Sequence, residues 1–265
     1  MRKLFFLCLL FSFSAVAQNF QNVALKEVDA TGGVANAVTR LPQGDRVWAA
    51  WTVPASAGRS IYCDRCSLDG NHGTFNISDD DDMPFTKTLV LVARLENGKA
   101  RRVRFFNAEC PVQGNGDTVY LLKNASPESS IDFLRASLDD ADKEGEIIAA
   151  ISLHEHPRVV PLLIDLARHD ADTHVRRDAL FWLGQKAGEK AAGELRRAVD
   201  EDPNEDVKEH AVFAISQLPP SRSVPILIEL VKTHKSRAVR KRAMFWLAQT
   251  NDPRALDTIE QILTR

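Results

Sequence analysis

The residues with the clearest chemical potential are three cysteines. Cys63 and Cys66 form a Cys-x-x-Cys segment, YCDRC, and Cys110 follows in NAECPV. In an oxidising compartment such cysteines form a structural disulfide, here from Cys63 or Cys66 to Cys110, and one thiol is left over. The alternative is a redox dithiol at Cys63 and Cys66, which requires a thiol pKa lowered by a helix N-terminus or a cation. The residues after Cys66 indicate a loop and no βαβ unit, so we favour the structural disulfide.

Other cofactor and metal chemistry has weaker support. Ser67 stands where a c-type haem attachment requires histidine, and His72 could join the three cysteines only in a zinc site whose geometry nothing in the sequence fixes. The run Asp79 to Asp82 lacks the staggered oxygen spacing of a calcium loop. The segment His154 to His156 does not match the H-E-x-x-H zinc motif, and we expect it at the surface of a turn. We therefore predict no catalytic residue, no metal and no cofactor.

The elements that must position any site repeat along the second half of the chain. One block recurs with a period of 207 − 175 = 32 and 239 − 207 = 32 residues: VRRDALFWLGQ from Val175, VKEHAVFAISQ from Val207 and VRKRAMFWLAQ from Val239. A second apolar stretch has the same period: PLLIDLARHD, GELRRAVDED, PILIELVKTH and DTIEQIL. A fixed period of this size indicates stacked helix pairs, with Pro161 and Pro225 in the first turns of their helices.

The repeats begin before these blocks. A weaker copy, SSIDFLRASL from Ser129 and EIIAAISL from Glu146, lies 32 residues upstream. One helix pair cannot bury both apolar faces, so the pairs must stack on one another. We predict an all-α, right-handed α-α solenoid over residues 126–265, with about four helix pairs and a terminal helix.

The pattern V-R-x-x-A-x-x-x-L-G resembles short HEAT-like repeats, including those of the family named after phycobilisome lyases. Its residues here are Val175, Arg176, Ala179, Leu183 and Gly184. The resemblance covers Pro127 to Arg265 and is specific for fold rather than function. It implies pairing of the arginine with an acid in a neighbouring turn. The matching basic residues are Arg176, Lys208 and Arg240, the acids are Asp170 and Asp202, and His234 interrupts the series.

Residues 18–125 have a different periodicity. Short apolar or alternating runs at residues 48–53, 88–95, 100–106 and 118–122 are rich in β-branched and aromatic residues, which indicates strands. Asn97-Gly98 lies between two of them and predicts a hairpin. We predict a small antiparallel β-rich domain. The layout, with the segment RFFNAECPV, resembles exported bacterial proteins that place a Trp- and Cys-containing β-domain ahead of HEAT-like repeats.

The first residues have the features of a secretory signal peptide. Arg2 and Lys3 precede an apolar run and the small residues Ala15-Val16-Ala17, which predicts residues 1–17 as the signal and cleavage after Ala17. We expect a periplasmic or secreted protein with no transmembrane segment once processed. Removing Arg2 and Lys3 leaves 34 − 2 = 32 basic against 36 acidic residues, a net charge of −4, which argues against a nucleic-acid partner.

One strip of the second helix of each repeat is not explained by stacking. It contains recurring aromatic, amide and charged positions: Phe181, Phe213 and Phe245; Gln185, Gln217 and Gln249; and Arg177, Glu209 and Lys241. In HEAT-like solenoids the second helices line the concave surface, so the strip could face a partner; alternatively, each phenylalanine packs against the neighbouring repeat. An acidic cluster over residues 200–209 and a basic cluster over 232–242 could steer an association.

The sequence favours a non-enzymatic, exported scaffold whose solenoid binds a protein or peptide of the cell envelope. The residues assigned to partner binding are Phe181, Phe213, Phe245, Gln185, Gln217, Gln249, Arg177 and Lys241. The competing hypothesis is thiol–disulfide redox activity at Cys63 and Cys66. The partner and the oligomeric state do not follow from the sequence.

Overall fold

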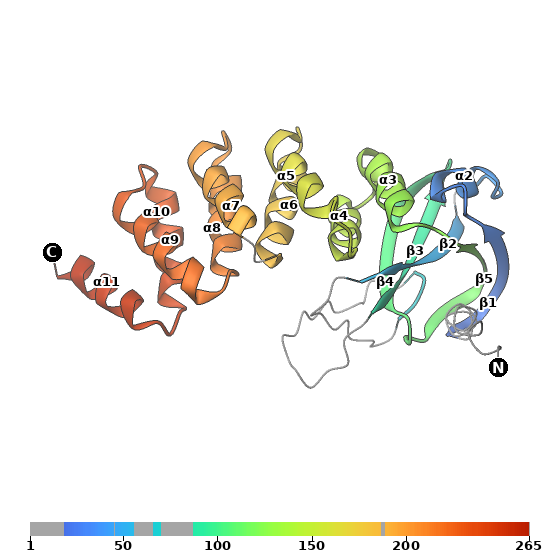
Figure 1. The fold of residues 1–265 in the computed structure, drawn as a ribbon, viewed down its shortest axis with the longest axis horizontal. Coiled ribbons are helices and arrows are strands. Elements are labelled where there is room, and N and C mark those ends of the chain that lie inside the picture. The colour runs from blue at the N-terminus through green and yellow to red at the C-terminus, as the bar shows by residue number, and fades with distance from the viewer. Residues whose placement is uncertain (1–18, 45, 56–65, 70–86, 187–188, 265) are drawn as a thin grey trace, which may run out of the picture. The chain divides into compact units, whose positions relative to one another are not determined.

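The computed structural model describes residues 19–44, 46–55, 66–69, 87–186 and 189–264 (Figure 1). The chain divides into two compact units, with the boundary between His156 and Pro157. The first unit therefore includes the first predicted helix pair as well as the β-domain. The predicted signal peptide lies outside the described residues.

The first unit contains a five-stranded mixed sheet in the order β1-β5-β2-β3-β4. The strands are β1 (Phe20–Asp29), β2 (Val47–Pro54), β3 (Thr88–Glu96), β4 (Lys99–Asn107) and β5 (Val112–Lys123). The predicted β-rich domain is confirmed, but the sheet is not wholly antiparallel. Strand β5 pairs in parallel with both β1 and β2, while β2–β3 and β3–β4 are antiparallel. The short helix α2 (Val34–Thr39) connects β1 to β2, because parallel strands on either side of β5 require a crossover.

The predicted hairpin is confirmed between β3 and β4. Asn97 and Gly98 form its two-residue loop and have φ angles of 49° and 74°. Positive φ at both positions defines the turn that matches the twist of paired strands, which is why Asn-Gly is favoured there.

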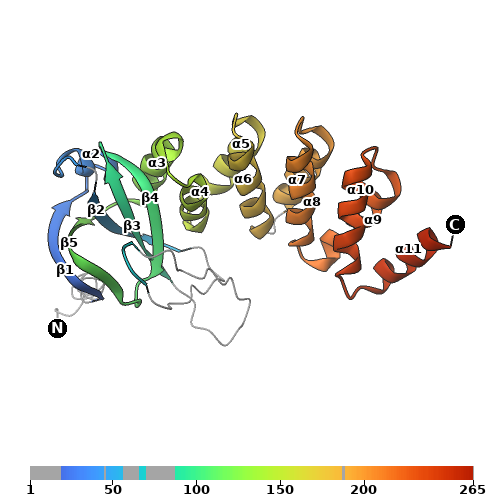
Figure 2. The same ribbon diagram turned by 180° about the vertical axis from the view of Figure 1, so that it is seen from behind.

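Each face of the sheet has its own core. On one face Trp48 packs with Cys66, Cys110 and Phe106 in a buried apolar cluster. Helices α3 (Pro127–Ser137) and α4 (Glu144–Leu153), joined by the 3₁₀ turn η1 (Leu138–Asp140), pack against the sheet (Figures 1 and 2). The ring of Phe133 in α3 meets Trp51 of β2 edge to face, with centroids 5.9 Å apart.

A buried hydrogen-bond network links α3, α4 and β2. Nε1 of Trp51 donates to Oγ of Ser130 at 2.7 Å, and Nε2 of His154 lies 2.9 Å from the same oxygen. Nδ1 of His154 lies 2.7 Å from the carbonyl oxygen of Ala150. The expectation that His154 lies at the surface is wrong, since it is 1% exposed. Its ring is buried because three polar groups satisfy it there.

The second unit is a stack of helix pairs, in which the second helices α6, α8 and α10 are neighbours (Figure 2). The helices are α5 (Val159–His169), α6 (Thr173–Gln185), α7 (Glu189–Glu201), α8 (Glu205–Ser216), α9 (Pro220–Thr233), α10 (Arg237–Ala248) and α11 (Pro253–Leu263). The 32-residue period extends to the caps. The N-caps Asp172, Asn204 and Ser236 are spaced 204 − 172 = 32 and 236 − 204 = 32 residues apart, and each side chain accepts a backbone N–H of its helix.

The predicted core positions are confirmed. Val175, Ala179 and Leu183 are at most 3% exposed, and their counterparts in α8 and α10 are also buried. A methyl group added to Gly184 would lie 2.7 Å from the carbonyl oxygen of Ala214, so the glycine permits close approach of α6 and α8.

The expected position of Pro225 is wrong. It lies inside α9, which begins five residues earlier at Pro220, rather than in the first turn. The carbonyl of Pro219 accepts the N–H groups of Arg222 and Ser223, so this upstream turn starts the helix. Pro161 is the third residue of α5, inside its first turn as expected.

The arginine–acid pairing is present at one step of the stack. Nε of Arg176 lies 3.0 Å from Oδ2 of Asp202, and a second nitrogen lies 3.2 Å from Oδ1. Both side chains are buried. At the next acid position stands His234, whose own carbonyl, with that of Lys235, accepts from Arg240.

Candidate functional site

The three recurring phenylalanines lie in one row of aromatic rings along α6, α8 and α10. Phe181 and Phe213 stack with centroids 6.0 Å apart and planes at 12°. Phe213 lies 5.0 Å from Trp246, which lies 5.0 Å from Phe245. Packing between repeats therefore accounts for part of the exposure pattern: Phe181 and Phe213 are partly buried, whereas Phe245 is 51% exposed. We call these four side chains, together with Trp182, the aromatic row.

The recurring glutamines lie at helix ends. Gln185 is the last residue of α6, and Gln217 and Gln249 are the C-cap residues of α8 and α10. Their backbone N–H groups close the final turns, which is a structural role for the position. Nε2 of Gln217 donates to Oγ of Ser216 at 3.1 Å.

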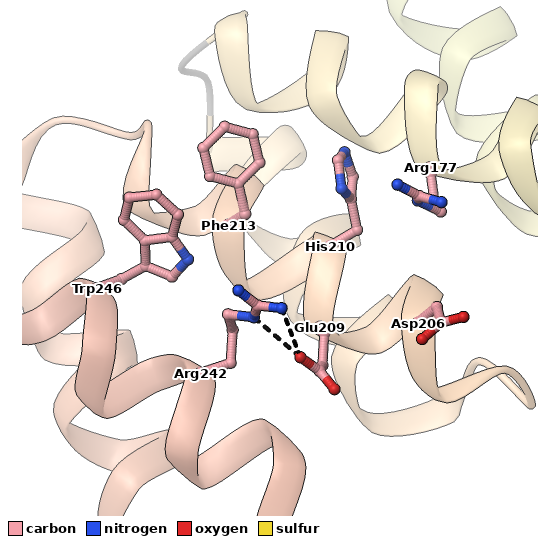
Figure 3. Close-up of a pocket in the computed structure, with 7 residues that line it drawn as sticks. All are labelled: Arg177, Asp206, Glu209, His210, Phe213, Arg242 and Trp246. Carbon is pink, nitrogen blue, oxygen red and sulfur yellow. Dashed lines mark hydrogen bonds and ion pairs between the residues drawn. The ribbon is translucent and has the colours of Figure 1, made fainter.

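A cavity of about 430 Å³ adjoins the aromatic row (Figure 3). It is lined by residues of α6, α8 and α10: Arg177, Asp206, Glu209, His210, Phe213, Arg242 and Trp246. Two residues assigned to partner binding from the sequence, Arg177 and Phe213, are among them, and Glu209 of the same strip is a third. Lys241 is exposed and does not line the cavity.

Three polar atoms of this lining are buried and lack a hydrogen-bond partner within the described part of the chain. They are Nε of Arg177, Nε2 of His210 and Nε1 of Trp246. Most buried polar atoms in folded proteins have a partner, and each one without costs about 1–3 kcal/mol. Two of the three, the arginine Nε and the indole nitrogen, can only donate. The cavity therefore presents unused donors.

The charges around the cavity are divided unequally. Glu209 is paired with Arg242, whose nitrogens lie 2.8 and 2.9 Å from Oε2 (Figure 3). Asp206 is exposed in the first turn of α8. Burial, followed by the neighbouring guanidinium groups of Arg177 and Arg242, lowers the pKa of His210 to about 4. At neutral pH the imidazole is uncharged, and Arg177 is the cation whose buried atoms remain available.

Sequence reasoning did not find His210, Arg242 and Trp246. His210 and Arg242 occupy one repeat position, 242 − 210 = 32, which holds Asp178 in the preceding repeat. The position changes residue type at each step, so it does not stand out as a conserved column of the repeat. The signal available was its offset of three residues before each phenylalanine, which places it on the same helix face.

The cysteines give little support to redox chemistry. Cys66 is 5% exposed and Cys110 is 2% exposed, both in the core cluster around Trp48. A redox dithiol must be reached by its partner, and burial in apolar surroundings opposes thiolate formation. Cys63 lies outside the described residues, as do His72 and the run Asp79 to Asp82, so the disulfide remains a prediction.

The described residues were also searched for two other features. No helix in these ranges combines the length and apolar composition that a membrane span needs. Within the same ranges, no three side chains of His, Cys, Asp or Glu are grouped so that they could hold a metal ion.

The stacked helix pairs and their 32-residue caps define a helical-repeat protein. The family model of HEAT repeats matches residues 131–216 and 194–265. Together these matches span residues 131–265, which is 265 − 130 = 135 residues and just over half of the chain. The chain therefore belongs to the HEAT repeat family, as its V-R-x-x-A-x-x-x-L-G pattern predicted.

Comparison with solved structures found similar helical proteins. One is the complex of CpcE and CpcF of phycocyanin lyase from Nostoc sp. PCC7120, with 23% identity, 45% of this chain and 85% of that chain covered, and a TM-score of 0.34. Another is human deoxyhypusine hydroxylase in complex with glycerol, with 20% identity, 51% and 56% covered, and a TM-score of 0.29. This chain thus spans little more than half of the human protein. At these TM-scores neither likeness bears on function, and the comparison with curated proteins found no match.

Proposed function

We propose that this chain is an exported scaffold that binds a partner protein or peptide across α6, α8 and α10. The observation that carries the proposal is the cavity beside the aromatic row, in which three buried nitrogen atoms have no partner among the described residues. A folded chain tolerates such atoms at a cost, and a ligand that supplies acceptors recovers it. HEAT repeats typically act in protein interaction, which agrees with this surface.

The exposed end of the row supports the same conclusion. Phe245 is 51% exposed although its neighbour Trp246 contributes to a buried lining. Aromatic side chains beside a cavity are common anchors for a partner, because they bury a large area with few rotatable bonds. The proposal also includes export, which rests on Arg2, Lys3 and the apolar run before Ala17.

Site-specific photo-crosslinking tests the binding surface in intact cells. A benzophenone side chain at position 245 should crosslink to a discrete partner, whereas the same group at exposed Lys232 on α9 should not. The identified partner is then purified and its affinity measured for the Phe245→Ser chain. We expect a loss of about tenfold or more, corresponding to loss of one interface anchor.

Leu256→Ser is the matched control, because Leu256 is also an exposed apolar residue, at 65%, but lies on α11. Equal affinity of the Phe245→Ser chain and the unaltered chain would refute the surface. Sequencing the N-terminus of the mature protein tests export, since processing after Ala17 leaves Gln18 first.

A further inference from the structure

We propose that the cavity lined by Arg177, His210 and Trp246 binds the carboxylate of an aspartate or glutamate side chain in the partner peptide. This inference rests on the proposed function and assigns its chemical specificity. The site combines two buried nitrogen atoms that can only donate with a cation whose Nε has no partner within the described ranges. A ligand must therefore bring acceptor oxygens.

The charge distribution selects a negatively charged acceptor. The charge of Glu209 is compensated by Arg242, at 2.8 Å, and Asp206 is exposed to solvent at the cavity rim. Arg177 has no such compensation among the described residues and also lies next to the uncharged ring of His210 (Figure 3). Hydrogen bonds to an ionised acceptor are about twice as strong as neutral ones, so a carboxylate is favoured over an amide.

The acidic side chains in the lining also limit the ligand. Asp206 and Glu209 would repel a phosphate dianion more strongly than a carboxylate monoanion, since the Coulomb energy scales with the product of the charges. A lysine or arginine side chain offers no acceptor to Nε1 of Trp246.

A peptide is the source of the carboxylate that fits the surroundings. Phe213 and Trp246 line the cavity and also belong to the aromatic row, which continues to the exposed ring of Phe245. A side chain in the cavity therefore has its backbone and its neighbours directed over apolar rings. This continuity supplies contacts that a free small acid does not use.

The test follows the indole N–H of Trp246 by ¹H–¹⁵N NMR of the purified full chain. The sequence contains 4 tryptophans, and the Trp246 signal is assigned by its loss in Trp246→Phe. The probes are three capped heptapeptides, alanine-leucine-alanine-X-alanine-leucine-alanine with X as glutamate, glutamine or lysine, together with acetate, acetamide and inorganic phosphate. A hydrogen bond to the indole moves its proton signal downfield.

We expect the glutamate peptide to shift the Trp246 signal with saturation and to bind about tenfold or more tightly than the glutamine peptide. The lysine peptide and acetamide should leave the signal in place, and acetate should shift it in the millimolar range. Arg177→Gln should remove the preference for glutamate. Arg237→Gln, at an exposed position of α10 outside the cavity lining, should keep it.

Several results would overturn the inference. Equal affinity for the glutamate and glutamine peptides is the most direct, and it uses the unaltered chain, so it does not depend on the folding of a variant. A stronger response to phosphate than to acetate would reject the carboxylate, and an unmoved Trp246 signal with every probe would reject the site. Equal binding of both peptides that is lost in Phe245→Ser would refute only the acid specificity, leaving the proposed binding surface intact.

Discussion

Tryptophan and histidine occur together in two places in this molecule, and their hydrogen bonds differ. In the first unit, the indole of Trp51 and both ring nitrogens of His154 are partnered by Ser130 and a backbone carbonyl. In the second unit, Nε1 of Trp246 and Nε2 of His210 are equally hidden from solvent but have no partner in the described part of the chain. The same side chains thus serve a stabilising network in one unit and an open binding site in the other.

Two adjacent arginines show the same contrast within a single helix. Arg176 makes two hydrogen bonds to Asp202 and further bonds to the carbonyls of Asp170 and Ala171. Its neighbour Arg177 points into the cavity with Nε unpartnered among the described residues. Neighbours on a helix point about 100° apart, so one residue serves the stack and the next serves the surface. Completeness of hydrogen bonding, rather than residue type or burial, separates structural groups from binding groups here.

The largest effect is expected where a complete network is broken. Asp202→Ala leaves Arg176, which is 8% exposed, as a buried charge without its carboxylate. The free energy of unfolding should fall by about 3–5 kcal/mol, measured by urea unfolding followed by far-UV circular dichroism. Glu201→Ala is the matched control, because Glu201 is exposed and pairs with Arg197. It should cost about 0.5 kcal/mol. Similar losses for both variants would contradict the assigned structural role.

Ser130→Ala tests the network of the first unit. One hydroxyl is removed, but Nε1 of Trp51 and Nε2 of His154 both lose their partner. We expect a loss of about 2–3 kcal/mol in the free energy of unfolding. The neighbouring Ser129 bonds only within the first turn of α3, so Ser129→Ala should cost less than about 1 kcal/mol. A neutral Ser130→Ala would show that this network is dispensable.

The repeat period explains why the second unit was largely predictable. Core residues such as Val175 and Leu183 recur at fixed positions, and stacking requires the same packing at every step. The caps recur for the same reason. The cavity was not predictable because a site breaks the repeat: its key position holds Asp178, then His210, then Arg242. A side chain's unused hydrogen bonds also depend on neighbours from other helices, which no single helix pattern contains.

The first unit was less predictable because its determining contacts are distant in sequence. Strand β1 pairs only with β5, about 90 residues away, and most of its side chains are exposed or partly exposed, so it lacks the alternation that indicates a strand. Parallel pairing of β5 on both sides likewise has no local signal. His154 was misplaced because Ser130, which satisfies it, lies 24 residues upstream. Local patterns gave the Asn97-Gly98 hairpin correctly, since that turn is determined by its own residues.

His210 should make the second unit sensitive to mild acid. Its pKa is lowered from 6.5 to about 4 by burial and by Arg177 and Arg242. As the pH falls below about 6.5, the unfolded chain binds a proton that the folded chain does not, so the folded state loses stability until about pH 4. The loss should be about 1 kcal/mol, allowing for the partial exposure of the ring. His210→Gln should remove this component when urea midpoints are compared at pH 7 and pH 4.5. Parallel losses in both chains would contradict it.

The smallest effect on stability is expected at Trp246. Trp246→Phe removes some buried area, but it also removes an N–H that has no partner in the described chain, and these two changes oppose each other. The free energy of unfolding should therefore change by less than about 1 kcal/mol. Trp51→Phe, the same substitution in the complete network, deprives Ser130 of its donor and should cost about 2 kcal/mol or more. Equal costs for the two substitutions would mean that the Trp246 indole is already satisfied within the folded chain, and a satisfied donor would have no hydrogen bond left for a ligand.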